Sequence, residues 1–232
     1  MATSRKETRP ETGGALAAGA RLLEIYGELA RQEKHLLGKL LNGSAPCQWS
    51  HYPEDDAFDP ARGFQWFYHS HSPEDRPGAA EHGHVHLFAR RKLWSRRLKS
   101  ARETAFSRLA DGDQALANTR HLLCIGFDAK GIPNTLFTVN SWVTGDLMLS
   151  AETTADILSR LSLNTGHPEV DGVIECVVRL CQSEIKSLLE ARDQRLFGWK
   201  FPGVLGDQKL ELLSELPIDM DGKLAALTDV SR

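Results

Sequence analysis

The sequence predicts an α+β fold in which an antiparallel sheet of about four strands is flanked by helices. Segments with the apolar spacing of amphipathic helices lie toward both ends of the chain. Between them lie short segments rich in aromatic and β-branched residues, two of which enclose a glycine-containing turn typical of a hairpin. At 232 residues the chain is long enough for one domain. We expect a disordered tail over residues 1–14 and a single α+β domain with a helical C-terminal part over residues 15–232.

The first half of the chain is predicted to form a helix, two strands and a second helix. Apolar residues recur at helical spacing up to Asn42-Gly43, a typical C-terminal stop. A segment with several prolines and acidic residues follows and indicates a loop that holds at most one short strand. Two runs that alternate in character then indicate strands. The predicted elements are a helix over 15–41, the loop over 46–62, strands over 64–71 and 82–89, and a helix over 91–109.

The second half is predicted to form a β-hairpin and two helices. Runs rich in β-forming residues on both sides of Lys130-Gly131 indicate the hairpin. Ser150 is a favourable N-cap, and Pro168 suits the first turn of a helix. The predicted elements are strands over 121–128 and 135–143, helices over 150–161 and 168–191, and then irregular structure around one short helix.

Composition argues against several classes of function. A formal net charge of −3 gives no reason to expect nucleic acid or a membrane surface as a partner. No apolar stretch reaches the about 20 residues that a membrane-spanning helix needs, and the N-terminus lacks the apolar core of a secretory signal. The four cysteines form no Cys-x-x-Cys pair. We therefore expect buried thiols in a reducing cytoplasmic setting, with neither disulfides nor a thiolate zinc site.

Histidines form the most informative feature of the sequence. Six of the nine lie between positions 51 and 86. Five of these six occur in two alternating runs, Tyr68-His69-Ser70-His71 and His82-Gly83-His84-Val85-His86. Alternate residues of a strand point to the same side, so each run places its imidazoles on one face of a sheet. The isolated histidines, expected to be structural residues with hydrogen-bond partners, are His35, His121 and His167.

A hairpin between the two runs would bring these imidazoles together. Antiparallel pairing across residues 72–81 predicts three pairs: His71 with His82, His69 with His84, and Phe67 with His86. Directly opposed residues have Cβ atoms about 4.5–5.5 Å apart, so both strands could supply ligands to one ion. The alternative is a polar sheet face exposed to solvent.

This arrangement predicts a transition-metal site. The expected metal ligands are His69, His71, His82 and His84. The residues expected around them, in orienting, acid–base or substrate-contacting roles, are His51, Glu81, His86 and Asn140. An all-imidazole set suits iron or zinc, and copper would also fit, whereas calcium and magnesium would not. Two histidines with a nearby carboxylate would imitate the ligand set of non-haem iron enzymes, which slightly favours iron.

Three functions are open at this point. The first is a metal-dependent enzyme, an oxidoreductase with non-haem iron or a zinc hydrolase, that acts on a small molecule or peptide. The second is a non-catalytic metal- or ligand-binding accessory protein, which a closed four-ligand shell would favour over an open coordination position. The third follows from residues 82–88, which are similar to the histidine-triad motif of nucleotide hydrolases and transferases, with Gly83 where that motif has an apolar residue.

Four motifs together resemble a bacterial family that is classed only as a domain of unknown function. They are HYPEDD at 51–56, YHSH at 68–71, EHGHVHLF at 81–88 and LFTVNSWVTG at 136–145. The resemblance extends over about residues 22–196. It implies a bacterial cytoplasmic protein and brings no activity, cofactor or catalytic residue with it.

Overall fold

The computed structural model describes residues 9–70, 81–109, 117–199 and 203–230 of the chain. Within these ranges one antiparallel sheet has the strand order β1-β2-β3-β4-β5-β6, so each strand pairs with its neighbours in sequence. The strands are β1 Tyr52–Phe58, β2 Phe64–Ser70, β3 Gly83–Arg90, β4 Thr119–Phe127, β5 Pro133–Val139 and β6 Leu212–Pro217. The helices are α1 Arg9–Arg31, α2 Leu36–Leu40, α3 Arg91–Trp94, α4 Ala101–Ser107, α5 Ser141–Thr144, α6 Ala151–Ser159, α7 Pro168–Leu180, α8 Gln182–Gly198 and α9 Met220–Val230.

The α+β class is confirmed, but the described sheet has six strands and the prediction of about four is wrong. The additional strands are β1 and β6, which form the two edges of the sheet. Both are partly exposed along most of their length. Edge strands bury little apolar surface, so their sequences lack the clear apolar pattern by which a strand is recognised.

Several predicted helices are shorter than expected or are interrupted. The first helix begins at Arg9 and ends at Arg31, and a separate short helix, α2, follows. The segment expected to form one helix over residues 91–109 forms α3 and α4. The long helix expected from Pro168 divides at Cys181 into α7 and α8, although no glycine or proline marks this point. The hairpin and the N-cap role of Ser150 are confirmed.

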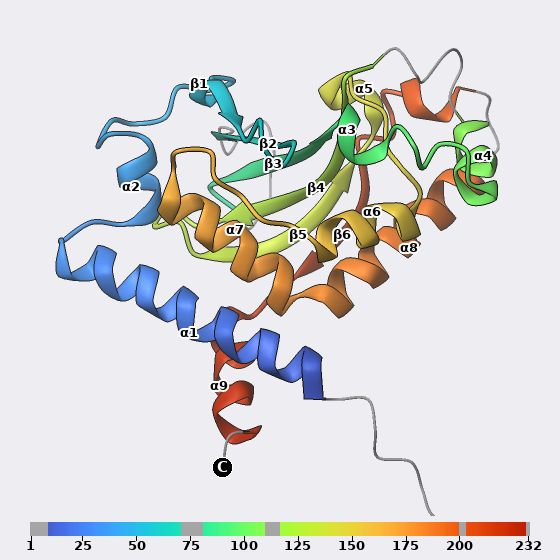
Figure 1. Cartoon of the computed structure of the whole chain (residues 1–232). Coiled ribbons are helices and arrows are strands. Elements are labelled where there is room, and N and C mark those ends of the chain that lie inside the picture. Colours follow the sequence, from blue (N-terminus) through green and yellow to red (C-terminus); the bar gives the residue numbers. More distant parts are fainter. Residues whose placement is uncertain (1–8, 71–80, 110–116, 200–202, 231–232) are drawn as a thin grey trace, which may run out of the picture.

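The helices cover one face of the sheet. Figure 1 shows α1, α6, α7 and α8 gathered on the same side of the strands. Alternate strand residues such as Trp66, Val85 and Ile125 join helix residues in the main hydrophobic core on this side. Trp66 also donates from Nε1 to Asp171 Oδ1 of α7 at 2.8 Å. Because side chains alternate along a strand, the intervening residues lie on the opposite face.

No helix in the described part of the chain is both long and apolar enough to cross a membrane.

Candidate metal centre

The sheet register brings histidines from two strands together. β2 and β3 pair antiparallel, with His69 opposite His84 and Phe67 opposite His86, as predicted. The strand residues that alternate with these histidines, such as Tyr68 and Val85, belong to the hydrophobic core beneath the helices. The histidines therefore project from the face of the sheet opposite the main helix layer.

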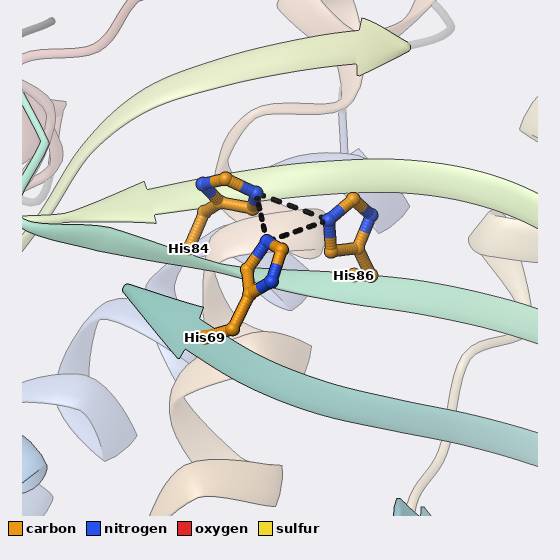
Figure 2. Close-up of side chains that lie close together, drawn as sticks. All are labelled: His69, His84 and His86. Carbon is orange, nitrogen blue, oxygen red and sulfur yellow. Dashed lines mark hydrogen bonds between the residues drawn. The ribbon is translucent and has the colours of Figure 1, made fainter. Parts of the chain in front are cut away.

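Three imidazoles on this face converge on one point. The Nε2 atoms of His69 and His84 lie 2.8 Å apart, those of His84 and His86 3.0 Å apart, and those of His86 and His69 3.1 Å apart. Figure 2 shows the three rings turned toward one another from β2 and β3. Their planes cross at 84°, 67° and 72°, so the rings meet edge-on and do not stack.

Hydrogen bonding alone does not satisfy this triangle of nitrogens. An imidazole nitrogen carries either one hydrogen or one lone pair, and either points outward in the ring plane. Among three such nitrogens around a common centre, at least two carry the same group. In that pair a hydrogen faces a hydrogen, or a lone pair faces a lone pair, and no hydrogen bond can form. A cation at the centre removes the conflict, because all three nitrogens can then offer lone pairs to it. The described residues thus contain a buried histidine cluster that could bind a metal ion.

The cluster is shielded from bulk solvent. His69 is 9% exposed, His84 2% and His86 1%. The alternative of a polar sheet face exposed to solvent is therefore wrong for these histidines.

Glu81 lies on the side of His84 away from the triangle. Its Oε1 is 3.8 Å from His84 Nδ1, and both side chains are almost fully buried. A carboxylate near the second nitrogen of a ligating histidine orients the ring and raises its basicity. Its position is consistent with the orienting role that the sequence suggested.

His86 has two further neighbours that the sequence analysis missed. Its Nδ1 is 3.1 Å from His121 Nε2 and 3.3 Å from Cys124 Sγ, and those two atoms are 3.4 Å apart. Both residues belong to β4 and are buried. Burial lowers the pKa of His121 to about 3, and the positive charge of Arg192 adds to this effect. The His121 ring is therefore neutral at neutral pH.

A β-bulge explains why His121 and Cys124 were missed. Leu87 pairs with Leu123, but the next residue, Phe88, pairs with His121, so β4 contains one extra residue at this point. In a regular strand, residues three positions apart face opposite sides. The extra residue turns both side chains to the histidine face, and His121 is part of the cluster instead of an isolated structural histidine. The sequence offered one indication that His121 and Cys124 could join the site: their strand follows the histidine hairpin closely and could pair with it.

Of the other two predicted ligands, the structure describes His82, which lies elsewhere. His82 is exposed, and its Nδ1 lies 3.0 Å from the hydroxyl of Tyr68, a side chain of the helix-covered core. It does not join the converging nitrogens. His71, and with it the predicted pair His71–His82, lies outside the described residues. The third nitrogen comes instead from His86, which the sequence analysis placed at the periphery.

Asn140 is also directed away from the converging nitrogens. Its side-chain amide donates to the backbone oxygens of Val204 and Leu210 at 2.8 and 2.9 Å. Its side-chain oxygen accepts from the backbone N–H of Ser141 at the start of α5. Asn140 therefore holds the segment before β6 against the end of β5.

The three histidines line a cavity of about 550 Å³. This volume is within the range of about 300–1,000 Å³ that is typical of small-molecule sites. Its aromatic walls are formed by Trp49, Phe67, Phe88, Phe137 and Trp142. Its carboxylates are Asp56, Asp146 and Glu211, and no lysine or arginine occurs among the described lining residues. Burial raises the pKa of Asp146, against the opposing effects of its hydrogen bond from Thr119 and of Arg120.

His51 and Asp56 form a hydrogen-bonded pair in the wall of this cavity. His51 Nδ1 lies 2.9 Å from Asp56 Oδ1, and the His51 ring stacks on Phe67 with centroids 3.7 Å apart. Gln65 Nε2 donates to the other oxygen of Asp56 at 2.6 Å. Asp56 has a φ of 54° beside an irregularity in the pairing of β1. Such strained positions redirect side chains and occur often at functional sites.

A larger depression, of about 920 Å³, lies between α2, β1 and the start of α7. His51 contributes to both hollows. Lys39 and Glu169 form an ion pair in its wall. The groups of described residues that could hold a metal ion all lie on the histidine face of the sheet and none lies in this depression. The histidine cavity is therefore the better candidate for chemistry.

These features define an α+β protein that has a helix-backed antiparallel sheet and a buried histidine cluster beside a small cavity. A family model matches residues 16–218, and the chain belongs to this family, whose description is domain of unknown function (DUF6969). The resemblance to a domain of unknown function is thereby confirmed. Comparisons with curated proteins and with solved structures gave no significant match.

Proposed function

We propose that this chain is a metal-dependent enzyme whose transition-metal ion is bound by the Nε2 atoms of His69, His84 and His86. One observation carries the proposal: three buried imidazole nitrogens face one another within 2.8–3.1 Å in the wall of a cavity. Three protein ligands beside a cavity leave coordination positions open, as catalytic sites require. A closed four-ligand shell would have favoured an accessory protein instead.

The spacing of the nitrogens favours iron over zinc. Two nitrogens each 2.1 Å from an ion are about 3.0 Å apart when they bind at right angles and about 3.4 Å apart at the tetrahedral angle. The observed separations of 2.8, 3.0 and 3.1 Å are nearer the first value. Right-angled binding on one face leaves three positions free, as in the non-haem iron oxygenases, although there a carboxylate takes the place of the third histidine. Zinc-dependent hydrolysis is the second candidate, and copper would also accept three imidazoles.

The cavity supports a division of roles around such an ion. The ion would polarise or activate a substrate, oxygen or water bound at its open positions. His51 Nδ1 faces a carboxylate oxygen of Asp56, and this contact leaves Nε2 as the ring nitrogen that can act on a substrate. We propose that His51 acts there as a general base. Aromatic walls and three carboxylates favour a neutral or cationic small substrate with apolar surface.

The charge of the cavity does not favour a nucleotide as substrate. In a metal-free histidine-triad site, transfer of a phosphoryl group would depend on cationic side chains around the phosphate oxygens. The described lining residues include three carboxylates and neither lysine nor arginine. In addition, His84 and His86 face each other through Nε2, so neither is directed singly at a phosphorus atom.

Metal analysis of untagged protein tests the proposal. Wild-type protein reconstituted with ferrous iron or zinc should hold the metal at stoichiometric level after exhaustive dialysis. His84→Ala should hold one ion per chain less than wild type, because one of the three nitrogens is absent. His82→Ala is the matched control: it removes an exposed histidine two residues away that contacts Tyr68, and it should bind as wild type does.

Two results would contradict the proposal. The first is wild-type protein that retains no transition metal after reconstitution. The second is equal retention by wild type and by a folded His84→Ala protein, which would place the ion elsewhere. Folding of each variant is checked by circular dichroism and by its melting temperature.

A further inference from the structure

We propose that the chain binds a second transition-metal ion, held by Nδ1 of His86, Nε2 of His121 and Sγ of Cys124, so that the His86 imidazole bridges two ions. The bridge rests on the proposed function, because the first ion occupies the opposite nitrogen of the same ring. Two of its three ligands, His121 and Cys124, have no ligand role at the first ion, and a metal bound by Cys124 would depart from the expectation that the buried cysteines bind no metal.

The geometry of the three donor atoms matches one coordination sphere. The two nitrogens are 3.1 Å apart, and the sulfur lies 3.3 and 3.4 Å from them. With bonds of about 2.1 Å to nitrogen and 2.3 Å to sulfur, nitrogen–sulfur separations run from about 3.1 Å at right angles to about 3.6 Å at the tetrahedral angle. The observed distances fall inside this interval. The three atoms form one of the two groups in the described chain that could hold a metal ion.

Hydrogen bonds cannot serve all three contacts equally well. When His86 Nε2 faces the first ion, the hydrogen of this ring lies on Nδ1, and Cys124 carries another on its thiol. A hydrogen on His121 Nε2 would point at the one on His86 Nδ1, so the single lone pair of His121 Nε2 has to serve both donors. Bulk solvent does not reach this group, since His86, His121 and Cys124 are exposed by 2% or less, and Phe88 packs its ring against His121 with centroids 5.2 Å apart. A cation would make all three contacts favourable at once.

His86 connects the two proposed metal sites, because each of its ring nitrogens faces one of them. Its Nε2 faces His69 and His84, and its Nδ1 faces His121 and Cys124. Binding of the second ion displaces one proton from the thiol and one from His86 Nδ1, and both protons pass to solvent. The His86 imidazolate would then place one negative charge between the two cations, and the Cys124 thiolate would place another beside the second cation. This compensation reduces the cost of burying charge in the sheet.

The two sites differ in the metals that they favour. A thiolate with two imidazoles is a softer donor set than three imidazoles and suits zinc or copper. The second site is also buried behind the first, because His121 and Cys124 do not line the cavity. Its ion would therefore tune the first ion through His86 and would have no direct contact with substrate.

Cobalt substitution tests this inference because thiolate ligation has a distinct optical signature. Wild-type protein saturated with Co²⁺ should bind two ions per chain and show a near-ultraviolet thiolate-to-cobalt charge-transfer band. Cys124→Ser should bind one ion and lose the band, while the visible bands of the imidazole site remain. His121→Gln should also fall to one ion, by loss of a different ligand. Cys176→Ser is the matched control, since Cys176 is buried in the core on the helix side of the sheet.

The outcomes separate this inference from the proposed function. One ion per wild-type chain without a charge-transfer band would overturn the second site and leave the first intact. Failure to bind any cobalt would overturn both. A single ion with the charge-transfer band would place the only metal at Cys124 and overturn the bridge. If both variants prove unfolded, the stoichiometry and the band of the wild type decide the question alone.

Discussion

His69 and His84 lie directly opposite each other on β2 and β3, and their Nε2 atoms are 2.8 Å apart. Two buried imidazoles in this position can share at most one hydrogen. His86 adds a third nitrogen at 3.0 and 3.1 Å and makes a purely hydrogen-bonded arrangement unfavourable.

Metal removal is expected to lower the thermal stability of the protein. An ion that binds only the native state stabilises it by about 2.7 kcal/mol at 100 times its dissociation constant. For a chain of 232 residues, this corresponds to a fall of about 5–10 °C in melting temperature on chelation. Scanning calorimetry with and without a chelator measures the difference. A folded His69→Ala protein should show a smaller shift, because it keeps only the ligands of the second site, and an equal shift in both proteins would count against His69 as a ligand.

Glu81→Gln is expected to weaken metal binding without changing its stoichiometry. Glu81 Oε1 lies 3.8 Å from His84 Nδ1, so its loss removes a negative charge that favours the ligating form of the ring. Substitutions of such outer partners typically reduce metal affinity by about 10- to 100-fold. Competition with a chromophoric chelator measures the affinity. Glu54→Gln, at an exposed position of β1, is the control, and an affinity unchanged in Glu81→Gln would rule out this orienting role.

One fast-reacting thiol per chain is expected in the native protein. Cys47 is exposed, whereas Cys124, Cys176 and Cys181 are buried. Burial raises the pKa of the Cys176 thiol to about 11 and that of Cys181 to about 12, so both remain protonated at pH 8 and react slowly. Titration with a disulfide reagent before and after denaturation measures the difference. Cys47→Ser should abolish the fast phase, and a second fast thiol would show that one of these side chains is accessible.

Asp171→Ala is expected to destabilise the fold and to leave metal binding unchanged. Asp171 accepts hydrogen bonds from Trp66 Nε1 and from the backbone and side chain of Thr165, at 2.7–2.8 Å. Its removal leaves these donors without an acceptor in the helix-covered core, at a cost of about 3 kcal/mol. Urea denaturation measures the loss. Asp221→Ala, at an exposed position of α9, should have almost no effect, and loss of metal from folded Asp171→Ala would show coupling between the two faces of the sheet.

Local sequence patterns were sufficient for much of the architecture. The alternation from Phe64 to Ser70 and from Gly83 to Arg90 predicted two strands, and their register followed from antiparallel pairing. The hairpin of β4 and β5 was recognised from its turn. The edge strand β6 was not recognised, and β1 was foreseen only as a short strand within a loop, because exposed edges lack an apolar pattern. The division of a long helix at Cys181 was not predictable either, since no breaking residue marks it.

The sequence predicted where the candidate site lies, on the two histidine strands, but not which histidines form it. His69 and His84 belong to the cluster, as expected. His82 contacts Tyr68, and His86 takes the position of third nitrogen. Whether a histidine at the end of a strand continues the alternation depends on where pairing stops, and this is set by the neighbouring strand. Periodicity alone therefore assigns interior positions more reliably than terminal ones.

By itself, the sequence determined the α+β class, the two histidine strands and the separation of an apolar face from a histidine face, because side-chain alternation is a local property of the backbone. Only the tertiary structure decided which atoms converge. The bulge in β4 turns His121 and Cys124 toward His86, and the irregular pairing of β1 accompanies the placement of His51 and Asp56 in the cavity wall. Both features arise from pairing between strands that are separate in sequence, so no local pattern could reveal them.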